Sequence, residues 1–385
     1  MAQRGQSELH GLYVALPFCR AKCSYCNFAS GVFPLRRQEE YCRALIRELE
    51  LTLAGLGCAR LLVDTMYWGG GTPTLLAPAR LVALAEEIRV RVVVHPGAEF
   101  TVEAMPGTLD DEILGALAAA GVNRVSLGVQ SFHEAEARAV GRLHSQAAVL
   151  ADLERLRRRG LTNVNLDLIA GLPHQTLASW RASLTAAIDT GVPHISVYLL
   201  EIDEDSRLGR EVLAGGGRYH APAVPDDDLA AEAYEIACAE LARAGLRQYE
   251  ISNFARPGFE SRHNERYWLR RPYLGLGIEA HSMAAVGGRM RRWGNYDGFE
   301  AYLAALAGGR LPRAEDSQVS DVGQRQEALF LGLRRNQGVP AISAAGFEAE
   351  VEELEAAGLL AREAGRIALT PRGRLLANEV FVRFV

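Results

Sequence analysis

Cys19-Arg20-Ala21-Lys22-Cys23-Ser24-Tyr25-Cys26 is the most informative stretch of the chain, because it holds three thiols at C-x3-C-x2-C spacing. It follows an apolar run, Leu12–Leu16, and is short enough to be a loop. Three cysteines this close can ligate one metal centre, and soft thiolates select zinc, copper or iron–sulfur clusters. Zinc would need a fourth ligand, for which His10 is the nearest candidate. A [4Fe-4S] cluster normally takes four cysteines, so three would leave one iron free to bind a small ligand.

The spacing and its flanks resemble the signature of the radical S-adenosylmethionine (SAM) proteins, in which SAM chelates the open iron. Tyr13-x5-Cys19, then Pro17-Phe18 and Cys26-Asn27-Phe28, are similar to the branch of oxygen-independent coproporphyrinogen III oxidases and heme chaperones of the HemW type. The resemblance implies that Cys19, Cys23 and Cys26 ligate the cluster and that Tyr13 and Tyr25 belong to the cofactor site. A chance group of buried cysteines is disfavoured, because Arg20 and Lys22 lie among them and favour thiolates.

Length and composition predict an ordinary globular protein. The 385 residues suffice for one large domain and a smaller one, or for two to three domains, and 49% of them are hydrophobic. A net charge of -5 gives no overall attraction to nucleic acid or anionic lipid. We expect a cytoplasmic protein with reduced cysteines, since the polar start, Met1–Gln6, lacks a signal-peptide core. We assign no role to three isolated cysteines: Cys42, Cys58 and Cys238.

Short apolar runs alternate with longer amphipathic stretches along the first half of the chain. The expected strands are Leu12–Leu16, Thr65–Trp68, Glu99–Glu103, Arg124–Val129, Asn163–Ile169 and His194–Leu200. This repetition predicts an α/β fold with parallel strands and helical crossovers, although periodicity does not separate a closed barrel from a partial one or an open sheet. The resemblance implies a partial (β/α)6 barrel, closed on one side by its sixth strand. In parallel barrels the chemistry lies at the C-terminal ends of the strands.

Glycine-rich or polar sequence motifs lie at the ends of four of these strands. Consecutive glycines in Trp68-Gly69-Gly70-Gly71-Thr72 let a backbone approach a ligand closely. Taken singly, each polar residue could equally cap a helix or form a surface ion pair. By resemblance, the SAM-contacting residues are Gly70, Gly71, Thr72, Glu103, Gln130, Arg142 and Asp167. Met105 departs from the family, where an asparagine is usual, and so removes one amide from the site.

A second motif, His263-Asn264-Glu265-Arg266-Tyr267-Trp268, gathers a histidine, an arginine and two aromatic residues. Composition alone favours a packed aromatic loop around a satisfied core histidine. The resemblance favours another interpretation, because this word matches the HNxxYW motif of heme chaperones, and it implies that His263, Tyr267 and Trp268 contact heme. Phe28 stands where the oxidases carry a fourth cysteine, and only 18 residues precede Cys19, whereas the oxidases have a longer extension. These features favour the chaperone branch.

We expect three domains: a radical SAM partial barrel over residues 1–213, an extension with the HNxxYW motif over 214–311, and a C-terminal domain over 312–385. Two helical patterns and a short hairpin arm make the last one a small α+β, winged-helix-like domain. Glu348, Glu350, Glu352, Glu353 and Glu355 line one of its helices, which argues against nucleic acid and for a packing or partner role.

Two classes of function follow from the resemblance. The favoured one is a heme chaperone without coproporphyrinogen oxidase activity, which uses a [4Fe-4S] cluster and SAM and delivers heme to apo-proteins, expected among respiratory membrane enzymes. The alternative is a coproporphyrinogen III oxidase-type enzyme that cleaves SAM reductively and decarboxylates a porphyrinogen. The expected partners also include an electron donor to the cluster. The resemblance allows a homodimer and a peripheral position at the inner face of the membrane. The sequence leaves open whether SAM is cleaved, which protein accepts the heme and how heme is ligated.

Overall fold

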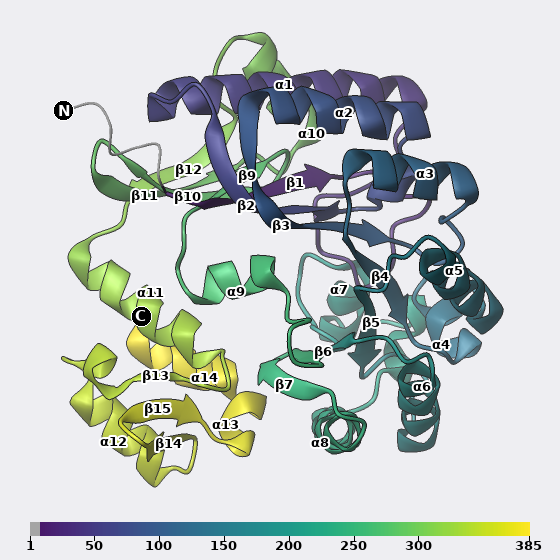
Figure 1. Ribbon diagram of the computed structural model, residues 1–385. Helices are drawn as coiled ribbons and strands as arrows, with labels where there is room; N and C mark the ends of the chain where they lie inside the picture. Colours follow the sequence, from purple (N-terminus) through teal and green to yellow (C-terminus); the bar gives the residue numbers. More distant parts are fainter. Residues whose placement is uncertain (1–7) are drawn as a thin grey trace.

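A computed structural model describes residues 8–385 and arranges their strands in two sheets (Figure 1). The polar start of the chain, residues 1–6, lies outside this range. The large sheet contains β1 (His10–Leu16), β2 (Leu61–Gly70), β3 (Val92–Ala104), β4 (Arg124–Gln130), β5 (Val164–Ala170), β6 (His194–Leu199), β7 (Arg247–Glu250), β8 (Asn253–Ala255), β9 (Tyr273–Leu276), β10 (His281–Val286), β11 (Arg289–Asn295) and β12 (Arg313–Gln318). The small sheet contains β13 (Val339–Pro340), β14 (Leu360–Glu363) and β15 (Arg366–Leu369).

Helices connect these strands and cover the outside of the large sheet. They are α1 (Leu35–Leu56), α2 (Pro78–Arg91), α3 (Asp111–Ala120), α4 (Glu134–Ala139), α5 (Gln146–Arg158), α6 (Leu177–Asp189), α7 (Arg207–Leu213), α8 (Asp227–Arg243), α9 (Arg262–Trp268), α10 (Phe299–Ala307), α11 (Asp321–Leu333), α12 (Glu348–Ala356), α13 (Pro371–Leu375) and α14 (Ala377–Phe381). Short 3-10 turns occur at Pro73–Leu75, Arg218–Ala223, Ala341–Ala344 and Val382–Phe384. Figure 1 shows α1, α2, α3, α5 and α6 following one another around the curved sheet.

The centre of the large sheet is a parallel array in the order β9-β1-β2-β3-β4-β5-β6. Each of the six expected strands overlaps one of β1 to β6, so the predicted α/β fold is confirmed. The sixth strand does not close the barrel: β8 and then β7 add to β6 in antiparallel fashion. On the other side β10, β11 and β12 continue the sheet beyond β9. The segment after β6 therefore extends both flanks of the barrel.

Alternation along β1 shows how the sequence produces this layer. Leu12, Val14 and Leu16 are fully buried and belong to the core, which also contains Tyr41 and Leu45 of α1. Successive strand residues point to opposite faces, so the residues between them face the barrel interior. Burying one such leucine contributes roughly 1.5–3 kcal/mol to stability. The interior face is left free for polar groups.

The C-terminal unit, residues 321–384, has its own small core and its own antiparallel sheet, in the order β13-β15-β14. Leu329 and Leu333 of α11 pack there with Val351, Val380 and Phe384. Strand β12 pairs with β11 in the large sheet, so that sheet continues past residue 311, where the expected second domain ends. Within residues 8–385, the search for a helix long and apolar enough to cross a bilayer finds none.

A buried carboxyl group, Glu48, ties α1 to the flank of the sheet. It is 1% exposed and accepts hydrogen bonds from the Gly277 amide (2.8 Å), Asn295 Nδ2 (2.5 Å) and the Tyr302 hydroxyl (2.7 Å). Burial raises the pKa of Glu48 to about 7, although these hydrogen bonds act in the opposite direction. Folding therefore favours the protonated form of this side chain.

The raised pKa of Glu48 predicts a pH-dependent stability. The folded state holds a proton that the unfolded state releases between pH 4.5 and about 7, so stability falls as pH rises through that window. We expect Glu48→Gln to remove about 3 kcal/mol of this pH-dependent loss in the free energy of unfolding. Urea unfolding at pH 5, 6, 7 and 8 measures it. If the free energy of unfolding of the variant fell between pH 5 and pH 8 by as much as that of wild type, this assignment would be contradicted.

Candidate cofactor site at the barrel mouth

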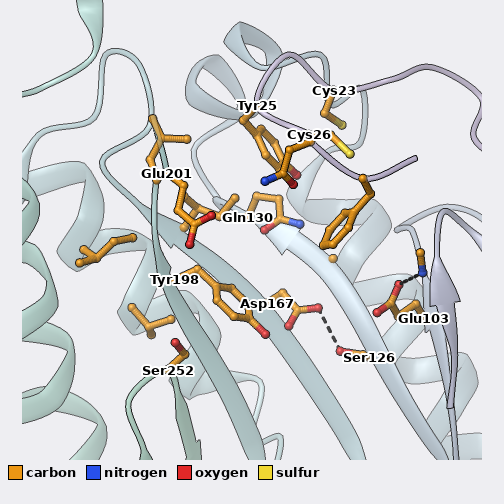
Figure 2. Close-up of a pocket in the computed structure, with 18 of the residues that line it drawn as sticks. Cys23, Tyr25, Cys26, Glu103, Ser126, Gln130, Asp167, Tyr198, Glu201 and Ser252 are labelled. Atoms are coloured by element: carbon orange, nitrogen blue, oxygen red, sulfur yellow. Dashed lines mark hydrogen bonds between the residues drawn. The ribbon is translucent and has the colours of Figure 1, made fainter. Parts of the chain in front are cut away.

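The cysteine loop connects β1 to α1 at the C-terminal end of β1, where the sequence places it. Two backbone hydrogen bonds join the ends of the loop: Cys19 N donates to Gly31 O (2.8 Å), and Gly31 N donates to Pro17 O (2.9 Å). Its three thiols are free and half-buried, and all three line a cavity of about 680 Å³. Figure 2 shows Cys23 and Cys26 above the strand ends that carry Glu103 and Asp167.

The arrangement of the thiols suits a cluster. Burial raises the pKa of the Cys19 thiol, and the neighbouring Cys26 and Cys23 act in the same direction. A cationic metal centre offsets this cost, because it stabilises thiolates. Among residues 8–385 no three His, Cys, Asp or Glu side chains converge on a single-ion site, and a cubane needs none because each thiolate binds a different iron.

His10, the candidate fourth ligand for zinc, lies away from the thiols. It begins β1, whereas the cysteine loop follows the end of that strand. Its ring is buried, and Nδ1 contacts the backbone oxygen of Glu8 at 2.9 Å. The structure therefore does not bring His10 to the cysteines.

Three distant side chains that the sequence did not single out hold the cysteine loop. Asn27 Nδ2 donates to Asp203 (3.0 Å), the Ala29 amide donates to Glu279 (2.6 Å), and Arg207 donates to the backbone oxygen of Lys22. Glu279 has a positive φ of 58°, which is uncommon for a residue other than glycine. The only sequence signal for these anchors is their polarity, because each lies far along the chain.

The glycine-rich word allows β2 to press its backbone against the cysteine loop. A Cβ on Gly71 would lie 2.6 Å from Leu16 O and 2.8 Å from Phe18 N, and one on Gly69 would lie 2.6 Å from Glu103 Cδ. Gly70 has a φ of 87°. Glycine is required at these positions by space or by conformation.

Two carboxyl groups face each other inside the barrel. Glu103 accepts hydrogen bonds from the Tyr67 hydroxyl (2.9 Å) and the Gly70 amide (3.1 Å). Burial, and then the nearby Asp167 carboxylate, raise the pKa of Glu103 to about 7. Burial also raises the pKa of Asp167, which accepts from the Ser126 hydroxyl at 3.0 Å (Figure 2). A cationic ligand would favour the ionised forms of both groups.

Gln130 and Arg142 present polar atoms that the protein leaves without partners. Gln130 has a φ of 70° at an irregularity in the pairing of β4 with β5. Its Oε1, and the Nε of Arg142, are buried and have no hydrogen-bond partner among residues 8–385. Arg142 Nη2 donates to the Tyr25 hydroxyl at 3.2 Å. Buried polar groups are normally paired, so these atoms fit a ligand held in the cavity.

All but one of the residues expected around the cluster and SAM line this cavity: Cys19, Cys23, Tyr25, Cys26, Gly70, Gly71, Thr72, Glu103, Gln130, Arg142 and Asp167. Tyr13 is the exception. A Cβ on Gly70 would lie 3.1 Å from its hydroxyl, so Tyr13 packs behind the glycine word. Burial raises the pKa of Tyr13, and Glu103 adds to this effect.

The HNxxYW motif lies elsewhere. His263 is 1% exposed, with Nδ1 2.9 Å from Thr65 Oγ1 and Nε2 2.8 Å from the Tyr267 hydroxyl. Burial, followed by Arg266 and Arg124, lowers its pKa to about 3. Thr65 precedes Gly70 on β2, so α9 packs at a level of the barrel before the strand ends; we call this level the barrel floor. In this arrangement both ring nitrogens of His263 lie within hydrogen-bond distance of protein hydroxyl groups, and its expected contact with heme stays a prediction.

The other motif residues join the barrel floor to the C-terminal unit, as the position of α9 in Figure 1 shows. Arg335 forms a bidentate ion pair with Glu265, in which Nε and Nη2 donate to the two carboxylate oxygens (3.0 and 3.1 Å). The Arg334 guanidinium lies 4.3 Å from the ring centre of Trp268. Trp268 thus stacks on a guanidinium group, whereas the Tyr267 hydroxyl lies 2.8 Å from His263 Nε2; the expected contacts of Tyr267 and Trp268 with heme stay predictions.

Comparisons with known proteins agree with these features. A family model described as the radical SAM superfamily matches residues 13–187, and one described as the HemN C-terminal domain matches residues 324–376. Heme chaperone HemW from Mycobacterium tuberculosis is 38% identical over 378 residues, which cover 96% of this chain and 93% of that protein. Heme chaperone HemW from Bacillus subtilis is 36% identical over 383 residues, which cover 97% of this chain and 98% of the relative.

A solved structure, that of coproporphyrinogen III oxidase (HemN) from Escherichia coli, has the same fold. Its TM-score is 0.84 at 24% identity, and the match covers 100% of this chain and 91% of that one. At this level of identity the likeness concerns the fold, and function has to be argued from the site.

The close approach at Gly71 predicts that a single methyl group displaces the cysteine loop. We expect Gly71→Ala to lower the free energy of unfolding by roughly 1–3 kcal/mol and to reduce the iron bound per chain after anaerobic reconstitution. Gly115→Ala in α3 is the matched control, because a Cβ there would meet nothing within 4 Å. Equal stability and equal iron content in the two variants would contradict the packing argument.

Proposed function

Because the chain belongs to the HemW family of heme chaperones within the radical SAM superfamily, we propose that it binds heme and passes it to apo-hemoproteins. The observation that carries this proposal is the near-complete coverage by HemW relatives at 36–38% identity. The cavity at the barrel mouth supports it, since three thiols and unpaired polar atoms converge there. The chemistry that such proteins use is supplied by cofactors, while the chain binds and orients them.

We assign the cluster to Cys19, Cys23 and Cys26, with the fourth iron open to SAM. The residues assigned to SAM are Tyr25, Gly70, Gly71, Thr72, Glu103, Gln130, Arg142 and Asp167, with Tyr13 supporting the glycine word from behind. When bound and reduced, a cluster of this kind would be able to supply one electron to SAM. The free Oε1 of Gln130 and Nε of Arg142 support this assignment, because a bound ligand would satisfy both.

The chain's own residues would hold SAM by charge and by shape. SAM carries an ammonium and a sulfonium group, and the Glu103 carboxyl, with a pKa of about 7, would ionise to meet a cation. Arg142 is half-buried beside the cysteine loop and would balance the negative charge of the thiolates. The glycines leave room for the ligand against the backbone of β2.

We further propose respiratory membrane enzymes as acceptors, together with an electron donor that reduces the cluster. The chaperone would then work in the cytoplasm and meet its acceptors at the inner face of the membrane. A homodimer is part of the same proposal. The relatives' name, heme chaperone, supports delivery of heme to apo-hemoproteins in general, and the family resemblance carries the particular acceptors, the electron donor and the homodimer.

The alternative is a porphyrinogen decarboxylase, which the match of residues 324–376 to the HemN C-terminal domain favours. Phe28 argues against it: this side chain lines the cavity and is 58% exposed at the position where the oxidases carry a further cysteine. The two functions differ in a direct assay. A chaperone binds hemin and releases no CO2 from coproporphyrinogen III, whereas the decarboxylase does the reverse.

Titration of the reconstituted protein with hemin tests the proposal. We expect a Soret band that saturates near one heme per chain, and no anaerobic decarboxylation of coproporphyrinogen III. The His263→Gln variant keeps a hydrogen-bonding side chain of similar size, and we expect its heme binding to follow its folded fraction, because His263 is a buried structural group. Absence of a Soret band together with CO2 release would overturn the proposed function. Loss of the Soret band in a fully folded His263→Gln protein would show instead that His263 ligates iron.

A further inference from the structure

The cavity extends beyond the residues assigned to the cluster and SAM, and its far wall comes from distant parts of the chain. One part is the end of β6, where Figure 2 shows Tyr198 and Glu201 on the side opposite Glu103. Another is the junction between α13 and α14 in the C-terminal unit. The residues of this far wall are Val197, Tyr198, Leu199, Leu200, Glu201, Tyr234, Ile251, Ser252, Arg334, Arg374, Leu375, Leu376, Ala377, Asn378 and Glu379.

Apolar side chains dominate the far wall although the cavity is open. Tyr198 is 39% exposed and Leu199 is 36% exposed, while Leu375 and Leu376, which line the same cavity, are half-buried. Large apolar side chains that stay accessible inside a cavity usually mark a binding surface. This part of the cavity is therefore suited to an apolar ligand.

Two arginines supply the positive charge of the far wall. The Nε atoms of Arg334 and Arg374 are buried and have no hydrogen-bond partner among residues 8–385. Arg374 Nη1 donates to Leu369 O at 3.2 Å, and Arg334 Nη2 lies 3.9 Å from Glu250. A guanidinium group carries five N–H donors, so each arginine keeps donors for a ligand.

Carboxylates also occur on the far wall, as Glu201 and Glu379. Both are exposed, so water and salt screen them. The arginines are only half-exposed, and charge-assisted hydrogen bonds to them are stronger in such surroundings. The net preference of the wall is for an apolar ligand that carries carboxylates along one edge.

We propose that heme docks on this far wall, with its ring against Leu199, Leu375 and Leu376 and its propionates on Arg374 and Arg334. This inference rests on the proposed function and gives that function a location. It also gives the C-terminal unit a role in ligand binding in place of the packing role expected from its acidic helix. Arg334 stacks on Trp268, so the HNxxYW motif acts on the heme site by positioning this arginine.

A hemin titration of the full-length protein tests this location. Arg374→Gln removes one of the two positive charges of the far wall, and we expect its Kd for hemin to rise roughly ten-fold or more. Arg372→Gln is the matched control, because Arg372 is exposed, donates to Ala357 O and does not line the cavity. Urea unfolding of both variants checks that they are folded.

Hemin dimethyl ester, which lacks the propionate charges, provides a second probe. We expect wild type to bind the ester more weakly than hemin, and this preference for hemin to be smaller in Arg374→Gln than in wild type or Arg372→Gln, because Arg334 remains as the second positive group. Equal Kd values for hemin in Arg374→Gln, Arg372→Gln and wild type would overturn the location while leaving the proposed function intact. Failure of the wild type to bind hemin at all would overturn both.

Discussion

Backbone pressed against backbone at Gly71 is the constraint on which the site depends. The glycine leaves no room for a Cβ between the end of β2 and the residues that lead into the cysteine loop, so the loop is fixed relative to the strand ends. The hydrogen bond from Thr72 N to Phe18 O (2.8 Å) fastens the same contact. Because the strands are parallel, their C-terminal ends meet at one level, and the thiols lie within reach of Glu103, Gln130, Arg142 and Asp167.

Burying carboxyl groups and unpaired polar atoms inside the barrel costs free energy, and a bound ligand can offset part of that cost. Burial raises the pKa of both Glu103 and Asp167, and Gln130 and Arg142 keep polar atoms without partners. Such a site costs stability in the free protein, and the leucines on the outer face of the sheet offset that cost. A cationic, hydrogen-bonding ligand would recover part of it.

Sequence patterns predicted the parts of the structure that depend on local order. The alternation in Leu12–Leu16 and the later apolar runs identified the parallel strands, and the cysteine spacing identified the loop. Long-range packing was beyond such patterns. The chain adds β8 to β6, so the sixth strand is not an edge, and it places α9 at the barrel floor, where His263 bonds to Thr65. The C-terminal unit reaches the cavity through Arg374, which lies over 200 residues from the strands of the SAM site, and no local pattern records that contact.

The central claim is that three thiols from one loop hold a cubane whose fourth iron accepts SAM. Low-temperature electron paramagnetic resonance of the anaerobically reconstituted and reduced protein, recorded with and without SAM, tests it most directly. The account predicts the signal of a reduced [4Fe-4S] cluster that changes when SAM is added and that is lost in Cys23→Ala. A bound tetrahedral zinc ion, or a cluster signal that is the same with and without SAM, would contradict it.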